Sequence, residues 1–254
     1  MLLLSVVVPI FNEEKIIFSE LENFTKCLSK FIDDNDWGFV IVNNGSTDNS
    51  QNEIEKILKF KKYSKCIFVE KPDYGLALRS GINSSNARFC HIINVEQWDI
   101  DFLKWSLENR KEYDLILGSK RADPTLNLQS NFRKFLSWGL NSILSLLFET
   151  VSIDTHGPKF LNMNRMKQII EETKLNRGQF DTEFSLRAQR EGLWIAEAPI
   201  KYHEKRRQKN FMIAKIYRNI FDLLKLRKIL KNVKYKSNVN FRRFSYFDIK
   251  NINK

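Results

Sequence analysis

Residues 3–14 read LLSVVVPIFNEE and residues 40–48 read VIVNNGSTD. Each stretch is a short apolar run that stops abruptly at proline, asparagine, glycine or acidic residues, a pattern typical of a buried strand that leads into a loop. In open α/β sheets, ligands bind outside the carboxyl ends of the strands, so polar residues at two such ends can face one crevice. The two stretches therefore predict an α/β sheet with a small-molecule site at its C-terminal edge.

Strand-like and helix-like segments alternate along the rest of the chain. Apolar residues recur at helical spacing over residues 17–31, and further strands are expected at 37–42, 66–70, 89–95 and 115–118. This alternation predicts a Rossmann-like, mostly parallel sheet flanked by helices. We expect one domain over residues 1–207 and a basic amphipathic extension over residues 208–254, whose last ~20 residues, rich in Asn and Lys, are weakly ordered.

Composition limits the class of protein. The chain has 254 residues, of which 43% are hydrophobic, and this suffices for one full core. Cys27, Cys66 and Cys90 are widely spaced, which disfavours a disulfide framework or a zinc cluster and favours a reducing cytosol. The N-terminal apolar run lacks the basic segment and cleavage site of a signal peptide, and no segment has the ~18 uncharged apolar residues of a membrane span.

The positive charge is concentrated near the C-terminus. Residues 201–254 hold 17 Lys or Arg against three acidic residues, whereas residues 1–200 hold 25 against 27. Apolar residues at helical spacing over 210–233, flanked by Lys and Arg, predict a basic amphipathic helix. We expect it to contact an anionic membrane surface and no nucleic acid, because its stripe is mainly aliphatic and it carries no aromatic stacking motif. The alternative is that the apolar stripe packs on the protein and the charges are solvated.

Eight short motifs follow one another along the chain: SVVVPIFNEE, VNNGSTDNS, DYGLALRSG, NVE, GSKR, DTHGPKF, FDTEF and EAPI. Over residues 3–207 the series resembles the family 2 glycosyltransferases of the GT-A fold, and most of all the dolichyl- and polyprenyl-phosphate sugar synthases. Single motifs are weak evidence, but eight in family order are specific. The resemblance implies transfer of a sugar from a UDP- or GDP-sugar to a polyprenyl phosphate or another cell-envelope acceptor, with inversion. From this resemblance, together with the cysteine spacing and the basic C-terminal helix, we expect a cytoplasmic enzyme associated peripherally with the inner face of the membrane.

The resemblance assigns a set of residues to the nucleotide sugar. Asn43 stands where relatives usually have Asp, so it can hydrogen-bond a base or ribose but supplies no charge. Gly75 would allow the backbone to approach the diphosphate, and Arg79 would neutralise it. Alternatively, Asn12 and Glu13 cap the first helix, and Arg79 is an exposed helical residue. The full set is Pro9, Asn12, Glu13, Asn43, Asp73, Gly75, Arg79, Asn94 and Glu96.

The expected Mg²⁺ or Mn²⁺ site departs from the family pattern. Relatives place D-x-D at the end of a strand, where this chain has Asn94, Val95 and Glu96. Hard divalent cations prefer charged oxygen ligands, and one of these has been lost. With Glu96 and Asn94 as the expected ligands, three interpretations stay open: weaker metal binding, cationic side chains in place of the metal, or a catalytically weakened protein that binds nucleotide sugars or lipid phosphates. Asp99 is expected to be a helix N-cap.

A third set of residues is assigned to the acceptor phosphate. Arg133 and Ser137 are four residues apart and so lie on one face of a predicted helix. A cation beside a hydroxyl is a suitable clamp for a phosphate. Lys205 and Arg206 follow the last strand, near where relatives carry an Arg-rich loop. The set is Lys120, Arg133, Ser137, Lys205 and Arg206.

Three acidic residues are candidates for catalysis. A hydroxyl acceptor needs a carboxylate to take its proton, whereas a phosphate acceptor is already anionic and needs cations more than a base. The resemblance favours Asp181 as the base, followed by Asp154, with Glu183 beside Asp181. Since Asp181 and Glu183 lie at the start of a predicted helix, they could instead only favour its dipole.

Overall fold

The structure, a computed structural model, describes residues 1–123, 157–201, 222–231 and 240–251, together with the single residues 139, 142, 148, 151, 154, 155 and 233. Its described part contains an eight-stranded sheet in the order β3-β2-β1-β4-β6-β5-β7-β8. Only β6 runs antiparallel to its neighbours, β4 and β5. The strands are β1 (Leu2–Ile10), β2 (Trp37–Asn43), β3 (Lys65–Phe68), β4 (Ala87–Ile92), β5 (Leu115–Ser119), β6 (Lys159–Asn162), β7 (Ile195–Pro199) and β8 (Phe241–Arg243). The predicted α/β architecture with a mostly parallel sheet is confirmed.

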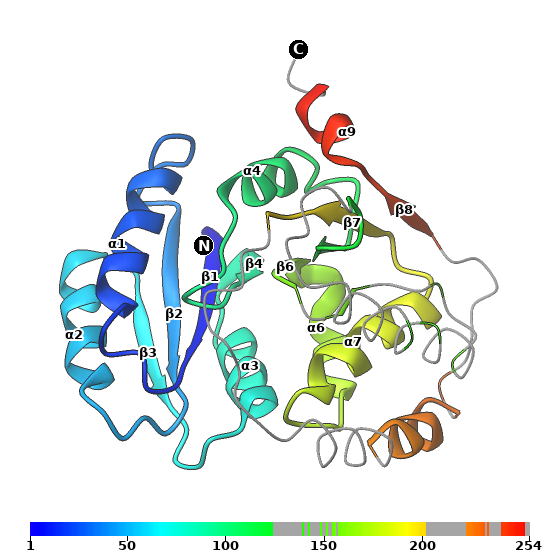
Figure 1. Cartoon of the computed structure of the whole chain (residues 1–254), viewed down its shortest axis with the longest axis horizontal. Helices are drawn as coiled ribbons and strands as arrows, with labels where there is room; N and C mark the ends of the chain where they lie inside the picture. Colours follow the sequence, from blue (N-terminus) through cyan, green and yellow to red (C-terminus); the bar gives the residue numbers. More distant parts are fainter. Residues whose placement is uncertain are drawn as a thin grey trace.

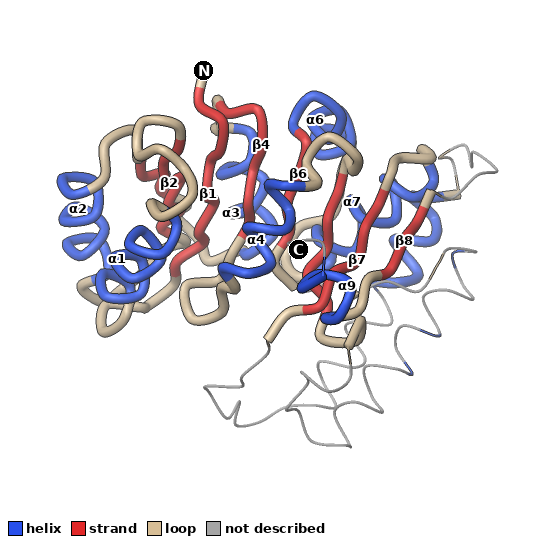
Figure 2. The backbone as a smooth tube through the Cα atoms, turned by 90° about the horizontal axis from the view of Figure 1, so that it is seen from above, coloured by secondary structure: helices blue, strands red, loops and turns tan. Residues whose placement is uncertain are grey.

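Helices cover both faces of this sheet (Figure 1). One face carries α1, α2 and α4, and the other carries α3, α6 and α7, as Figure 2 shows from above. Their bounds are α1 (Ile17–Leu28), α2 (Ser50–Phe60), α3 (Tyr74–Asn83), α4 (Ile100–Glu108), α6 (Met163–Glu172), α7 (Gln179–Arg190) and α9 (Tyr246–Asn251), and residues 222–230 are also helical.

The apolar run of β1 is buried on both sides because two helical layers enclose it. Val6 and Val8 point into the core shared with α1 and α4, whereas Val7 points into the core shared with α3 and α6. Successive side chains of a strand alternate between faces, so a strand buried on both faces is continuously apolar. Pro9 follows the last β1 residue that pairs with β4, Val7, and it has no N–H with which to extend that ladder.

The end of the chain departs from the expectation of weak order. Phe241–Arg243 form β8, which pairs with β7 in parallel, and the side chains of Phe244 and Ile249 are buried in the main core. Edge pairing and two buried apolar groups explain why this polar-rich segment folds. The domain boundary at residue 207 stays a prediction, since residues 202–221 lie outside the described residues.

Most of the described part of the amphipathic stripe packs on the protein, whereas Leu224 is 55% exposed. Leu223, Leu226 and Leu230 are buried in a cluster with Leu175 and Leu186. The alternative that the stripe contacts the protein is therefore confirmed for Leu223, Leu226 and Leu230, and a membrane contact cannot use these three leucines. Among the described residues, no helix combines the length and the apolar character that a bilayer crossing requires.

Candidate functional site

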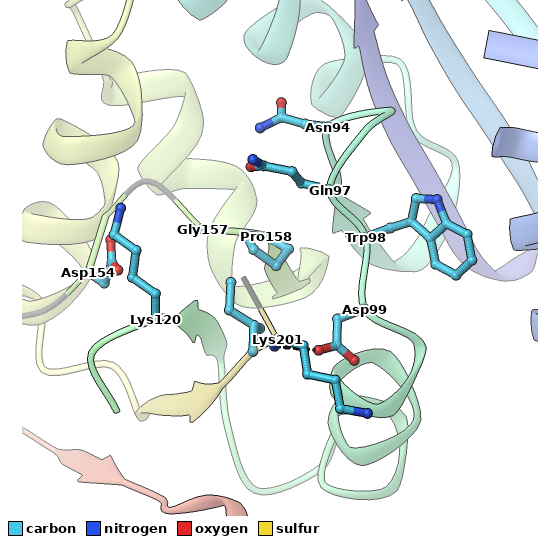
Figure 3. Close-up of a pocket in the computed structure, with 10 residues that line it drawn as sticks. Asn94, Gln97, Trp98, Asp99, Lys120, Asp154, Gly157, Pro158 and Lys201 are labelled. Carbon is cyan, nitrogen blue, oxygen red and sulfur yellow. Dashed lines mark hydrogen bonds between the residues drawn. The ribbon is translucent and has the colours of Figure 1, made fainter. Parts of the chain in front are cut away.

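The carboxyl ends of β4, β5 and β7 meet at a small cavity of about 30 Å³. Asn94 follows β4, Lys120 follows β5, Lys201 follows β7, and Asp154 precedes β6. Figure 3 shows Lys120 and Asp154 side by side on one flank, opposite Asn94 and Gln97. The cavity is completed by Gln97, Trp98, Asp99, Gly157, Pro158 and Ile200. Ammonium, carboxylate and amide groups thus surround one space at the predicted edge of the sheet.

An adjoining cavity of about 330 Å³ shares part of this wall. It has Gln97, Trp98, Asp99 and Lys201 in common with the small cavity. Its other lining residues are Glu20, Glu96, Ile100 and Asp101. The loop from Asn94 to the start of α4 therefore lies between the small cavity and the adjoining one and lines both.

Asn94 is oriented by a partly buried tyrosine. The hydroxyl of Tyr74 donates a hydrogen bond to Asn94 Oδ1 at 3.4 Å. Burial raises the pKa of Tyr74 well above its usual value, and the nearby Asp181 carboxylate raises it further, so the hydroxyl stays protonated and remains a donor. Figure 3 shows the Asn94 amide nitrogen on the side that faces Gln97 and Asp154, with the oxygen turned away. Asn94 therefore presents a donor to the small cavity.

Asp154 lines the cavity, whereas Asp181 lies behind its wall. Lys159 Nζ is 3.3 Å from Asp181 Oδ1 and donates to the carbonyl of Gly157, a lining residue. Lys159 and Asp181 are each 1% exposed. Asp181 Oδ1 accepts no hydrogen bond from the described residues, because the lysine is at ion-pair distance but not in hydrogen-bond geometry. Asp154 therefore lies at the cavity and Asp181 behind it, and which of the two acts as the base stays a prediction.

Glu183 has a structural environment. Its carboxylate accepts hydrogen bonds from the backbone N–H groups of Lys174 and Leu175 and from Arg187 Nε at 2.9 Å. The side chain is fully buried and lines neither cavity. A buried carboxylate with three donors fixes the segment between α6 and α7, so the expected catalytic role of Glu183 has no support from its position.

Two loops expected at the nucleotide are bonded to each other. Asn12 Oδ1 accepts from the backbone N–H of Thr47 at 2.8 Å, and the N–H of Asn12 donates to Ser46 Oγ. Asn43 Oδ1 accepts from the N–H of Ser46, and its Nδ2 donates to Gln51. Asn12 has a φ of 57° and caps no helix, so the helix-cap alternative for it is wrong. These contacts shape the C-terminal edge between β1 and β2.

Asp73, Gly75 and Arg79 contact the loop that connects α6 to α7. Asp73 caps α3 through the N–H of Leu76 and also accepts from the N–H of Arg177 at 2.8 Å. A Cβ on Gly75 would lie 2.5 Å from the backbone nitrogen of Arg177. The close backbone approach expected at this glycine is therefore made by residues 176–177 and not by a diphosphate.

Arg79 adds further hydrogen bonds to the same loop. Its guanidinium donates to the carbonyl of Thr173, to that of Leu175 at 2.9 Å and to Asn176 Oδ1. Burial lowers the pKa of Arg79, while Glu183 and Asp73 oppose this shift. A guanidinium with three protein acceptors is not an exposed helical residue, so that alternative is wrong. The role of Arg79 at a phosphate stays a prediction.

The expected metal ligands do not come together in the part of the chain that the structure describes. Asn94 lines the small cavity and Glu96 the adjoining one, with buried Val95 between them. Asp99 is the N-cap of α4, as expected: its Oδ1 accepts from Asp101 and Phe102, and its Oδ2 accepts from the N–H of Lys201. No three His, Cys, Asp or Glu side chains among the described residues are grouped to hold a metal ion. This donor set does not fit the Mg²⁺ or Mn²⁺ site expected at Asn94 and Glu96.

Some predicted residues cannot be placed, and others were missed. Arg133, Ser137, Lys205 and Arg206 lie outside the described residues. Sequence reasoning missed Tyr74 and Lys201. Lys201 directly follows the EAPI motif, so its position at a strand end could have indicated it, whereas the contact of Tyr74 with Asn94 crosses 20 residues and left no local pattern.

Comparison with known proteins adds independent evidence. Residues 5–94 match the model of the family described as Glycosyl transferase family 2. A dolichyl-phosphate beta-glucosyltransferase (ALG5A) of Trichomonas vaginalis is 27% identical over 216 residues, which cover 79% of this chain and 66% of that protein, just under two thirds. An uncharacterized protein of Methanocaldococcus jannaschii (MJ1222) is 29% identical over 204 residues, which cover 77% of this chain and 79% of that protein.

A solved structure agrees in fold. The mannosyltransferase PcManGT of Pyrobaculum calidifontis, in complex with GDP-Man and Mn²⁺, superposes with a TM-score of 0.62 at 14% identity. The superposition covers 92% of this chain and 65% of that one. At this identity the likeness concerns the fold. Together, the family match over residues 5–94 and the shared α/β architecture bear out the resemblance to family 2 glycosyltransferases of the GT-A fold.

Proposed function

We propose that this chain transfers a sugar from a UDP- or GDP-sugar to a polyprenyl phosphate, with inversion at the anomeric carbon. The family match supports the reaction class, and the dolichyl-phosphate beta-glucosyltransferase of Trichomonas vaginalis supports a lipid-phosphate acceptor. The structure bound to GDP-Man supports a nucleotide-sugar donor. The observation that carries the proposal is the cavity at the C-terminal edge of the sheet, where Lys120 and Asp154 face Asn94.

The residues around this cavity suit the charges of the reaction. An oxygen of the acceptor phosphate attacks the anomeric carbon, the bond from that carbon to the donor diphosphate breaks, and the nucleoside diphosphate leaves with the electron pair. Lys120 would hold an anionic phosphate, and a fixed cation beside developing negative charge lowers the barrier. Asp154 would take the remaining proton of a singly protonated phosphate, or the proton of a hydroxyl acceptor.

The described helix of the extension, residues 222–230, has a basic face that could contact a membrane. Lys225, Arg227 and Lys228 are exposed, and Leu224 beside them is 55% exposed, whereas the opposite side of this helix packs on the protein. Each basic group near an anionic lipid surface contributes roughly 1 kcal/mol. In this proposal the protein is cytoplasmic and binds peripherally to the inner face of the membrane, where a polyprenyl phosphate exposes its head group.

A panel of donors and acceptors tests the activity. The purified chain is incubated with radiolabelled UDP- and GDP-sugars and undecaprenyl or dolichyl phosphate, and label is counted in the lipid extract. We expect one donor to give labelled lipid, and the matching polyprenol, which lacks the phosphate, to give none. Equal labelling of the polyprenol would contradict a phosphate acceptor.

A second candidate is a nucleotide-sugar binding protein that has lost turnover. Two amides favour it, Asn43 and Asn94, which stand where relatives carry carboxylates. It predicts that calorimetry detects binding of a UDP- or GDP-sugar while no donor yields labelled lipid with any acceptor. Turnover with any donor rules it out.

A further inference from the structure

A buried carboxylate connects Asp154 to the C-terminal strand. Glu197 lies in the middle of β7, is fully buried, and is paired in register with Leu117 of β5 and with Arg243 of β8. Its Oε1 accepts a hydrogen bond from the backbone N–H of Asp154 at 2.8 Å, and its Oε2 accepts one from Arg243 Nε. Figure 2 shows β8 beside β7 at the edge of the sheet. One side chain therefore links a residue of the cavity wall to the end of the chain.

This link holds one end of the segment that borders the small cavity. Asp154, Gly157 and Pro158 all line that cavity. At the other end of the segment, the ammonium group of Lys159 donates to the carbonyl of Gly157 at 2.8 Å. The contact through Glu197 acts on Asp154 itself, so it bears directly on where the Asp154 carboxylate lies.

Arg243 supplies the charge that a buried carboxylate requires. Burial of an ionised carboxylate is unfavourable unless a cation and hydrogen bonds compensate it. Both oxygens of Glu197 are bonded, one to a guanidinium and one to a backbone N–H. Phe244 fixes the strand that carries Arg243, since its ring is buried in the main core and its N–H donates to the carbonyl of Glu197 at 2.9 Å. The end of the chain is therefore part of the support of the cavity wall.

We propose that Glu197 is a positioning residue for Asp154, and that Arg243 completes this function from the C-terminal strand. The inference rests on the proposed function for the catalytic role of Asp154. Glu197 and Arg243 are not among the residues that line the two cavities, and they act through the hydrogen bond to the N–H of Asp154. Arg243 comes from outside residues 3–207, the stretch that resembles the family.

The substitution Glu197→Gln tests the link to Asp154. It keeps the shape of the side chain, but an amide has a single oxygen and cannot accept from both Asp154 and Arg243. We expect kcat in the labelled-lipid assay to fall by about tenfold or more, because a misplaced reacting group loses rate steeply with distance. KM for the nucleotide sugar should change by less than about threefold. Kinetics are measured well below the melting temperature of each variant, so that a loss of stability alone does not lower kcat.

A second substitution tests Arg243 and supplies a rescue. The amide nitrogen of glutamine and Nε of arginine are both bonded to Cδ, so Arg243→Gln still reaches Glu197 but removes its counter-charge, and kcat should fall as in Glu197→Gln. In the double variant one amide accepts from the N–H of Asp154 and donates to the oxygen of the other amide. We expect kcat of the double variant to return to within about threefold of the unmodified chain, a coupling that independent losses would not give.

Arg242→Gln is the matched control. It removes the same charge from the same strand, but successive side chains of a strand point to opposite faces. The guanidinium of Arg242 lies over the ring of Phe244, 4.7 Å from its centroid. We expect kcat and KM of this variant to stay close to those of the unmodified chain.

Hydrogen exchange of the Asp154 amide measures the positioning without turnover. The N–H of Asp154 is protected by its bond to Glu197, so Glu197→Gln should speed its exchange by about tenfold or more. The double variant should restore the protection.

The outcomes distinguish this inference from the proposed function. An unchanged kcat or an unchanged exchange rate in Glu197→Gln overturns the inference and leaves the transferase proposal intact, and so does a double variant as slow as the single ones. If the unmodified chain turns over no donor, the transferase proposal fails, and exchange of the Asp154 amide alone then decides whether Glu197 positions this residue.

Discussion

Asn94 illustrates how one amide in place of a carboxylate changes the ligand that a site can take. The side chain has both a donor and an acceptor, and the surrounding protein decides which of them faces the cavity. Here Tyr74 takes the oxygen, so the nitrogen is presented. At the residue scale, the chemistry of the edge therefore depends on neighbours that are distant in sequence.

Asp154 and Asp181 should respond differently to the same substitution. Asp154 lines the cavity, whereas Asp181 is buried beside Lys159. We expect Asp154→Asn to lower kcat by about 100-fold or more with little change in stability, since it removes a proton acceptor. Asp181→Asn should mainly lower the melting temperature, because it leaves the buried ammonium group of Lys159 without its counter-charge.

Steady-state kinetics with the labelled-lipid assay and thermal unfolding are measured on both variants. A full loss of kcat in Asp181→Asn at unchanged stability, together with an active Asp154→Asn, would restore Asp181 as the base.

His91 should make the protein less stable in mild acid. The ring is fully buried beside Phe24 and Phe102, and Nδ1 donates to the carbonyl of Lys159 at 3.0 Å. Burial lowers the pKa of His91 from 6.5 to about 4. Above pH 6.5 the ring is neutral in both the folded and the unfolded chain. Between pH 6.5 and about 4 only the unfolded chain binds the proton, so stability is lost as the pH falls through this range.

Urea unfolding at pH 7 and pH 5 measures this effect. We expect the histidine to account for about 2 kcal/mol of the loss in unfolding free energy between these pH values. His91→Phe keeps an aromatic ring and removes the titration, so its loss should be smaller by that amount. An identical pH dependence in the two proteins would show that His91 binds a proton as readily in the folded state as in the unfolded state.

At the element scale, the start of α3 contacts the connection between α6 and α7. Asp73, Gly75 and Arg79 all contact residues 173–177, which connect α6 to α7. These residues belong to a motif that the resemblance assigns to the diphosphate. In this structure they position the connection between α6 and α7, and α7 carries Asp181 behind the cavity wall. Their spacing along α3 gave no sign of that partner.

A methyl group at Gly75 should disturb this junction. The Cβ of Gly75→Ala would lie 2.5 Å from the backbone nitrogen of Arg177, and a backbone atom cannot move aside as a side-chain end can. We expect a loss of about 1–3 kcal/mol in unfolding free energy, the usual cost of overpacking. Chemical denaturation measures it.

Gly178→Ala is the matched control. Gly178 has a φ of −70°, and a Cβ built on it meets no atom within 4 Å. Its replacement should be neutral or should stabilise the chain by up to about 1 kcal/mol, because alanine reduces the freedom of the unfolded chain. Equal destabilisation by the two substitutions would mean that the contact of α3 with residues 176–177 is not formed.

At the scale of the whole molecule, the charge asymmetry gives the protein one strongly basic region. The described helix at residues 222–230 buries Leu223, Leu226 and Leu230 on the protein and leaves its basic side chains in solvent. Reversing three of these charges should weaken binding to anionic vesicles by about 100-fold or more, from the loss of roughly 1 kcal/mol per basic group and added repulsion. The variant carries Lys225→Glu, Arg227→Glu and Lys228→Glu.

Co-sedimentation with phosphatidylglycerol vesicles at low and high salt measures this binding. A control with the same net charge carries the substitutions Lys30→Glu, Lys59→Glu and Lys62→Glu, all at exposed positions remote from that helix. We expect the control to sediment nearly as the unmodified chain does. Equal loss in both variants would indicate attraction by total charge and not by the helix.

The sequence determined the fold class, the order of strands and helices up to β5, and the edge of the sheet at which polar residues collect. These features follow from local patterns: apolar runs of strand length, helical periodicity, and breaker residues at strand ends. The position of Asp99 as a helix cap was also predictable, because a cap contacts only the next few residues.

Only the tertiary structure decided which of these residues face the cavity and which bond to the protein. Asp154 lines the cavity and Asp181 pairs with Lys159, although both are aspartates within family motifs. Arg79 contacts carbonyl groups 94 and 96 residues away, and β8 pairs with β7 from the end of the chain. Such contacts depend on packing between segments remote in sequence, and no local pattern records the partner of a hydrogen bond that the folded chain creates.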